Sequence, residues 1–217
     1  ICKAIPSPAT LFDWAASLAG VNYMLGEQRC IDVYEAMKNE VAERVARKEG
    51  AVIDEKYRLY WDGIVCWPKL GHLADKFANL GACVVAGRYT HMGFYSVPEK
   101  IDPEKPLESM AENTVVLHFN HNIDWLIDSV SRMCQEYAID GVISHAHRTC
   151  RIIAATQLEI MDGVSRRLGI PTAFFEADMA DETFYSEGQV DTRIQALVEN
   201  IAAKKRVYAI VDILLLP

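Results

Sequence analysis

From Tyr57 onward, short apolar runs alternate with longer stretches whose apolar residues recur every three or four positions. The short runs have the length and composition of strands, and the longer ones have the period of amphipathic helices. Four runs are predicted as strands: Tyr57–Trp61, Ala82–Ala86, the run that begins at Asp140, and Thr172–Phe175. Strands that alternate with helices are typical of a parallel sheet, because each parallel connection must cross back over the sheet.

The predicted fold class is therefore α/β, a flavodoxin- or Rossmann-like parallel sheet with helices on both faces. The helices that should cover the sheet are expected at 70–80, 107–116, 123–137, 151–168 and 187–203. The stretch Gly169-Ile-Pro171 is expected to end the fourth of them. The last apolar run, Val207 to Leu216, is predicted as a final strand.

Residues 1–50 differ from the rest because they contain helical patterns without intervening strands. Apolar residues around Leu11 to Leu18 form one stripe, and Val33, Met37, Val41 and Val45 form another at spacings of four. We expect a helical segment over residues 1–50, either the end of a preceding amino-terminal domain or a link to one. Residues 51–217 are then an α/β carboxyl-terminal domain.

Composition and charge exclude several classes of protein. The chain carries 22 Lys and Arg against 30 Asp and Glu, a formal charge of −8, which disfavours nucleic acid as a partner. No apolar run is long enough to suggest a membrane span. The six cysteines are scattered without a Cys-x-x-Cys pair, so we expect reduced thiols and a cytoplasmic location.

Cys150 is the first candidate for chemistry, because it stands between the third strand and the helix that begins at Arg151. A thiol at the amino end of a helix lies against the positive end of the helix dipole, which favours the thiolate. The thiolate is both the nucleophile and the metal ligand. The alternative is that Cys150 is a small packed hydrophobe, as free cysteines usually are.

Other polar residues should join Cys150, because ligands of parallel sheets bind beyond the carboxyl ends of the strands. Four segments that follow strands are predicted to meet at this edge: 66–67, 88–91, 145–150 and 176–178. The acidic residues Glu176, Asp178, Asp181 and Glu182 could instead cap the helix near Glu187.

Three kinds of site are compatible with these residues to different degrees. Zinc could bind His145, His147 and Cys150, although His-x-His in a loop is only moderately specific. Cys150 could be a nucleophile with either histidine as its base. A dinucleotide site is disfavoured, because no Gly-x-Gly-x-x-Gly turn follows a strand.

Several motifs together resemble the carboxyl-terminal part of the 2-hydroxyacyl-CoA dehydratase and benzoyl-CoA reductase family. They are His147-Arg-Thr-Cys-Arg151, Leu168-Gly-Ile-Pro171, Phe175-Glu-Ala-Asp-Met179, Asp181, and the stretch from Phe184 to Ile194. The resemblance extends back through Arg58–Gly63 and Pro106–Ala111. It covers residues 50 to 204, and it rests on the order and spacing of the motifs rather than on any single one.

The resemblance implies an oxygen-sensitive enzyme of two related subunits, each holding an iron–sulfur cluster that is usually of the 4Fe-4S type. Cys150 matches the cluster cysteine that the later domain contributes, and it is the expected metal and cofactor ligand. The other cluster cysteines of the family come from an earlier domain. We therefore expect the remaining ligands outside this chain, on a further domain upstream.

The implied mechanism is one-electron chemistry on an acyl-CoA. A separate ATP-dependent iron–sulfur activator protein supplies an electron that reaches the thioester carbonyl of the coenzyme A substrate. The resulting ketyl radical allows loss of a 2-hydroxyl group to give an enoyl-CoA. From position alone, we expect His145, His147 and Arg148 to support the cluster or to polarise the thioester oxygen.

The motifs look closest to subunits that act on substrates such as 2-hydroxyglutaryl-CoA, so the dehydratase branch is preferred. A subunit of an ATP-dependent aromatic-ring reductase is the nearest alternative. A third possibility is a non-catalytic partner or a truncated module that docks another subunit.

Overall fold

A parallel sheet of four strands lies at the centre of the structure, a computed structural model that describes residues 1–24, 26–92 and 101–214. The strands are β1 (Tyr57–Asp62), β2 (Ala82–Gly87), β3 (Gly141–His145) and β4 (Thr172–Phe175). All neighbouring pairs are parallel, in the order β2-β1-β3-β4. The predicted α/β class and the four strand positions are confirmed.

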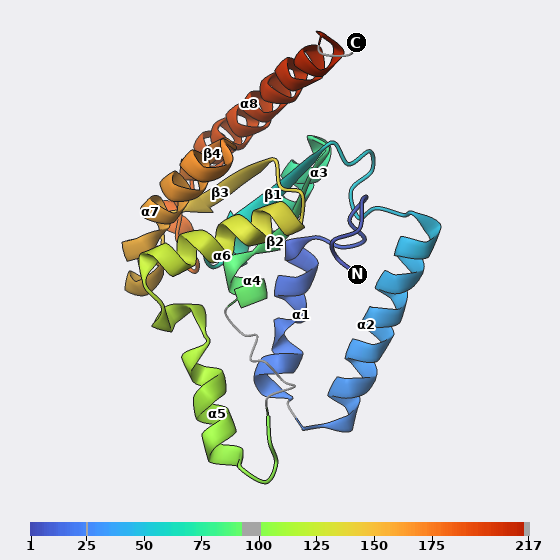
Figure 1. Ribbon diagram of the computed structural model, residues 1–217, viewed down its shortest axis with the longest axis vertical. Coiled ribbons are helices and arrows are strands. Elements are labelled where there is room, and N and C mark those ends of the chain that lie inside the picture. Colours follow the sequence, from blue (N-terminus) through green and yellow to red (C-terminus); the bar gives the residue numbers. More distant parts are fainter. Residues whose placement is uncertain (25, 93–100, 215–217) are drawn as a thin grey trace.

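Helices cover both faces of the sheet, as expected for a parallel sheet (Figure 1). One face packs against α1 (Leu11–Tyr23), α3 (Leu70–Asn79) and α8 (Glu187–Leu214). The other packs against α6 (Ile123–Glu136) and α7 (Arg151–Leu168). The remaining helical elements are α2 (Gln28–Arg47), α4 (Arg88–Met92), α5 (Pro106–Val115), and the short 3-10 turns η1 (Trp67–Lys69), η3 (His118–Asn120) and η4 (Glu182–Phe184).

The alternation of side chains along β1 explains how one strand serves both cores. Leu59 and Trp61 point into the core with α1, α3 and α8, whereas Tyr60 points into the core with α6 and α7. All three side chains are completely buried. A strand that is buried on both faces carries a nearly continuous apolar run, which is why the sequence pattern located it.

The strand order creates a switch point between β1 and β3. After β1 the chain turns to β2 on one side, and β3 then begins the other half of the sheet. The carboxyl ends of β1 and β3 therefore carry loops that leave in opposite directions, and ligands of such sheets generally bind at this position. The loop after β1 and the loop from His145 to Cys150 both start at this point.

Helix α1 is part of the packing around the sheet. Thr10 and Asp13 form a reciprocal capping box at its amino end. Leu11, Phe12 and Ala15 are buried in the same core as Trp61. The placing of a domain boundary at residue 50 stays a prediction.

Helix α2 contributes little to either core, although the sequence shows an apolar stripe along it. Cys30 and Val41 are buried, but Val33 on the same stripe is 54% exposed. Figure 1 shows α2 and α5 extending away from the sheet.

The predicted final strand from Val207 to Leu216 is wrong for the part that the structure describes. Helix α8 continues through this region to Leu214. The reason lies in the residues between the two predicted elements. Lys204-Lys205-Arg206 contains no glycine or proline, so nothing ends the helix there. Within the described ranges, none of the helices combines the length and the apolar character that crossing a membrane requires.

Gly63 should be intolerant of a side chain, because two independent constraints act on it. Its φ of +100° lies in a region that residues with a Cβ rarely adopt, and an added Cβ would lie 2.3 Å from His147 Cε1. We expect Gly63→Ala to lower the free energy of unfolding by about 1–3 kcal/mol. Urea unfolding followed by circular dichroism would measure it.

Gly71→Ala is the matched control. Gly71 lies in the first turn of α3 and an added Cβ would meet no atom within 4 Å. Its unfolding midpoint should stay the same or rise slightly, because alanine favours helix. Equal midpoints for the two variants would contradict the constraint at Gly63.

Candidate functional site

The loop after β1 is held by two histidines from the end of β3. The backbone N–H of Ile64 donates to His147 Nε2 at 2.9 Å, and His145 Nε2 lies 2.7 Å from the Ile64 carbonyl oxygen. The two imidazole rings lie 4.0 Å apart between centroids. Both side chains are almost completely buried. His145 and His147 thus join the two loops that flank the switch point.

The partners of His147 fix where its proton sits. Nε2 accepts from the Ile64 N–H and also lies 3.1 Å from the Ile64 carbonyl oxygen; the acceptor role assigns the proton to Nδ1, which lies 3.1 Å from Gln157 Oε1. The side-chain nitrogen of Gln157 in turn donates to the His145 carbonyl oxygen at 2.7 Å. Every member of this buried set is therefore hydrogen-bonded in one arrangement.

Burial keeps the two histidines neutral at pH 7. It lowers the pKa of His145 to about 4, with neighbouring His147 acting in the same direction. Burial also lowers the pKa of His147, although its hydrogen bonds to Ile64 and Gln157 act in the opposite direction. Neither ring reaches solvent, so both act on the loops rather than on a molecule outside.

A buried ion pair lies beside the histidines. Asp62 at the end of β1 faces Arg88 at the start of α4, with Nε to Oδ1 and Nη2 to Oδ2 both 3.0 Å. Arg88 also donates to Thr156 Oγ1 on α7 at 3.2 Å. Burial raises the pKa of Asp62, and Arg88 opposes this effect. The pair ties the ends of β1 and β2 to α7.

Cys150 lies at the amino end of α7, as the sequence predicts. Its backbone N–H donates to the His147 carbonyl at 3.1 Å, and its own carbonyl accepts from Ala154 at 3.0 Å. The side chain is partly exposed and makes no capping hydrogen bond. It therefore stands, partly exposed, at the positive end of an 18-residue helix.

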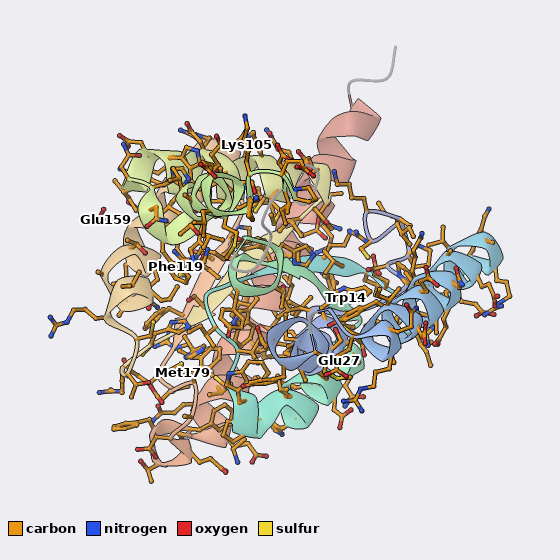
Figure 2. The ribbon with its side chains drawn as sticks, turned by 90° about the horizontal axis from the view of Figure 1, so that it is seen from below. Trp14, Glu27, Lys105, Phe119, Glu159 and Met179 are labelled. Carbon is orange, nitrogen blue, oxygen red and sulfur yellow. The ribbon has the colours of Figure 1, made fainter. Side chains whose placement is uncertain are left out.

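The loop after β4 completes this edge. Asp178 accepts hydrogen bonds from the Thr149 backbone at 3.1 Å and from the Thr149 hydroxyl at 2.9 Å. The Met179 carbonyl accepts from the Trp67 backbone at 3.0 Å. In Figure 2, the label Met179 marks this loop, which lies in the left half of the view together with Glu159 of α7. The predicted meeting of the strand ends at one edge is confirmed.

Arg148 lies on the outer surface of this edge. Its guanidinium pairs with Glu176, and it stacks over the ring of Phe184 at 4.5 Å. Arg148 also lines a cavity of about 300 Å³ between β4 and α7, together with polar residues such as Glu176 and apolar ones such as Leu158. Of the three residues predicted as catalytic, only Arg148 is exposed.

The other cysteines differ from Cys150 in burial or in position. Cys66 also follows a strand, but it is completely buried, and burial raises its pKa to about 12, with Asp178 adding to the effect. Cys30, Cys83 and Cys134 are buried, and Cys2 lies near the start of the chain. In the described parts of the chain, no three His, Cys, Asp or Glu side chains form a group that could hold a metal ion.

These residues fit an iron–sulfur cluster as the source of one ligand. A cluster requires thiolates that can reach it, and the Cys66 side chain is completely buried. Cys150 has the exposure and the helix position that a thiolate ligand requires. A zinc site made of His145, His147 and Cys150 fits less well, because both histidines are already bonded to Ile64.

The sequence located the strand ends but missed most contacts that hold them. Asp62 and Gln157 were not predicted as part of the site, whereas Arg88 belongs to the segment 88–91 that was expected at this edge. The alternative that the acidic loop caps the helix near Glu187 stays a prediction; in the structure, Asp181 caps η4 through Thr183, and Asp178 binds Thr149. Asp178 belongs to the segment 176–178 that the sequence placed at this edge, but its hydrogen bonds to Thr149 were not predicted.

Comparison with known proteins places the chain in a family. The family model for "2-hydroxyglutaryl-CoA dehydratase, D-component" matches residues 1–201. The match therefore includes α1 and α2, which precede the motifs recognised in the sequence.

Individual relatives agree with this match. The chain is 29% identical over 204 residues to the (R)-phenyllactyl-CoA dehydratase alpha subunit of Clostridium sporogenes, covering 94% of this chain and 48% of the relative. It is 28% identical over 201 residues to the alpha subunit of the (R)-2-hydroxyglutaryl-CoA dehydratase of Acidaminococcus fermentans, covering 91% and 40%. It is 27% identical over 187 residues to a benzoyl-CoA reductase subunit of Thauera aromatica, covering 83% and 43%.

The chain thus spans less than half of the length of these relatives, although most of it takes part in each match. The family match, by contrast, runs nearly from end to end of the chain. The fold at the switch point and the position of Cys150 agree with the motifs on which the resemblance was based. The chain belongs to the family described as 2-hydroxyglutaryl-CoA dehydratase, D-component.

Proposed function

We propose that this chain is part of a subunit of a 2-hydroxyacyl-CoA dehydratase, and that Cys150 is its ligand to a 4Fe-4S iron–sulfur cluster. The observation that carries the proposal is the position of Cys150. All six cysteines are described, and only Cys150 is both accessible and at the carboxyl edge of the sheet. The names of the dehydratase relatives support the same class of reaction.

The remaining cluster ligands would come from outside this chain, because the described residues offer no second accessible thiol at this edge. When bound, such a cluster supplies one-electron reduction of the thioester carbonyl of an acyl-CoA, which makes loss of a 2-hydroxyl group feasible. The proposed partners are therefore a second related subunit, an ATP-dependent iron–sulfur activator protein and the acyl-CoA substrate.

The residues of this chain have three tasks in the proposed mechanism. Cys150 stands at the amino end of α7, where a helix dipole favours an anionic ligand. His145 and His147 stay neutral and hold the loop after β1 through Ile64. Their buried side chains keep water out of the interior next to the turn that carries Cys150. Arg148 presents a cation at the surface, where it could meet the thioester oxygen after leaving Glu176.

A subunit of a benzoyl-CoA reductase is the second candidate, because one relative carries that name and matches 83% of the chain. The two candidates share the proposed ligand and differ in the fate of the first electron. Dehydration returns the electron at the end of each cycle, whereas ring reduction keeps it in the product. A non-catalytic partner is the third candidate, in which Cys150 would bind no iron.

Replacing Cys150 with alanine should lower the iron and acid-labile sulfide bound by the complete, anaerobically purified complex and abolish turnover. The physical reason is the loss of a thiolate that no other residue at this edge can replace. Metal analysis and the absorption of the cluster would measure the effect. Cys2→Ala is the control, because Cys2 is also partly exposed but lies near the start of the chain. An unchanged iron content in Cys150→Ala would show that Cys150 is not a cluster ligand and would favour its interpretation as a packed thiol.

Counting ATP against product should separate the two enzymatic branches. With activator and a 2-hydroxyacyl-CoA, dehydration should form many product molecules for each ATP hydrolysed, because the electron is reused. Ring reduction of benzoyl-CoA should consume ATP in every cycle. The measurement is anaerobic product analysis by liquid chromatography alongside phosphate release, with a control without acyl-CoA. ATP consumption in fixed proportion to product would refute the dehydratase assignment.

A further inference from the structure

Asp178, in the loop after β4, accepts four hydrogen bonds. One carboxylate oxygen accepts from the backbone and the hydroxyl of Thr149, at 3.1 and 2.9 Å. The other accepts from the backbones of Ala180 and Asp181, at 3.0 and 3.1 Å. The side chain is only 3% exposed. The carboxylate therefore joins the loop after β3 to the loop after β4.

Hydrogen bonding keeps this carboxylate charged. Burial alone would raise the pKa of Asp178, but the hydrogen bonds from Ala180, Asp181 and Thr149 outweigh it and lower the pKa to about 2. Charged acceptors form stronger hydrogen bonds than neutral ones. Thr149 is thus held by two bonds to an ion rather than by two ordinary contacts.

The hydrogen bonds between Thr149 and Asp178 act on the turn that carries Cys150. It directly precedes Cys150, whose backbone donates to the His147 carbonyl. His147 is fixed on its own side by Ile64 and Gln157. The short turn that carries the thiol is therefore held from two directions, by the buried histidine and by Asp178.

We propose that Asp178 is a positioning residue that fixes the turn carrying Cys150 through its two hydrogen bonds to Thr149. It does not touch the reacting atoms. The importance of Asp178 for catalysis rests on the proposed function, because the position of Cys150 matters for catalysis only if Cys150 is a cluster ligand. The positioning itself can be measured without iron.

The first test compares Asp178→Asn with Asp181→Asn in the full purified protein. Asp181 is a matched control, since it lies in the same loop and accepts from the backbone and hydroxyl of Thr183 in the same way. In Asp178→Asn, amide hydrogen exchange in residues 146–150 and iodoacetamide labelling of Cys150 should accelerate by about tenfold or more, as expected for bonds to a charged acceptor. Asp181→Asn should keep the wild-type rates.

The second test removes the hydroxyl bond without changing any charge. Thr149→Val should accelerate exchange and labelling, and Thr149→Ser, which keeps the hydroxyl, should restore the wild-type rates. This pair excludes a purely electrostatic effect of Asp178 on the thiol. It also remains informative if Asp178→Asn does not fold. Exchange in β1 should be unchanged in both Thr149 variants, which separates local positioning from loss of overall stability.

The positioning role is refuted if Thr149→Val behaves like wild type, or if Asp181→Asn accelerates labelling as much as Asp178→Asn does. Neither readout needs a bound cluster. Faster labelling together with unchanged iron in Cys150→Ala would keep the positioning role and reject the proposed function. Loss of iron in Cys150→Ala with no effect of Thr149→Val would support the proposed function and reject the positioning role.

Discussion

The buried ion pair between Asp62 and Arg88 is the interaction on which the carboxyl edge of the sheet depends. Both side chains are withdrawn from water, so the loss of either partner would leave an uncompensated charge in the interior, at a typical cost of about 3–5 kcal/mol. Through Thr156 the pair also reaches α7, whose amino end carries Cys150. The same two charges act on His147 in opposite directions, so neither dominates its protonation. The two histidines can therefore stay neutral beside the buried pair.

Most of the fold could be predicted from the sequence because its elements are bounded by strong local signals. The limits of α7 and β4 agree with the prediction because Gly169 and Pro171 separate the two elements. The prediction failed at the end of the chain, where an apolar run was assigned to a strand. Apolar residues alone do not distinguish a strand from a helix, and here the helix continues because no residue stops it.

The site could be located from the sequence, but its internal contacts could not. The rule that parallel strand ends meet brought Cys150 and Asp178 to one edge without any knowledge of coordinates. The partners of the histidines were beyond such reasoning, because the Ile64 backbone has no signature in the sequence and lies far along the chain from His147. A catalytic role for His145 and His147 stays a prediction; their burial favours support of the loops.

The arrangement separates rigid support from accessible chemistry. Asp62, Arg88 and the two histidines are buried at the edge and held by the ion pair and by hydrogen bonds to Ile64, whereas Cys150 is partly exposed. A ligand that must hold its geometry during electron transfer benefits from such a base, because a loosely held loop would let the ligand shift when the charge changes. A single thiol cannot hold a cluster alone, so this rigidity has a further consequence. The turn must present Cys150 in a fixed direction if ligands from another part of the protein are to meet it.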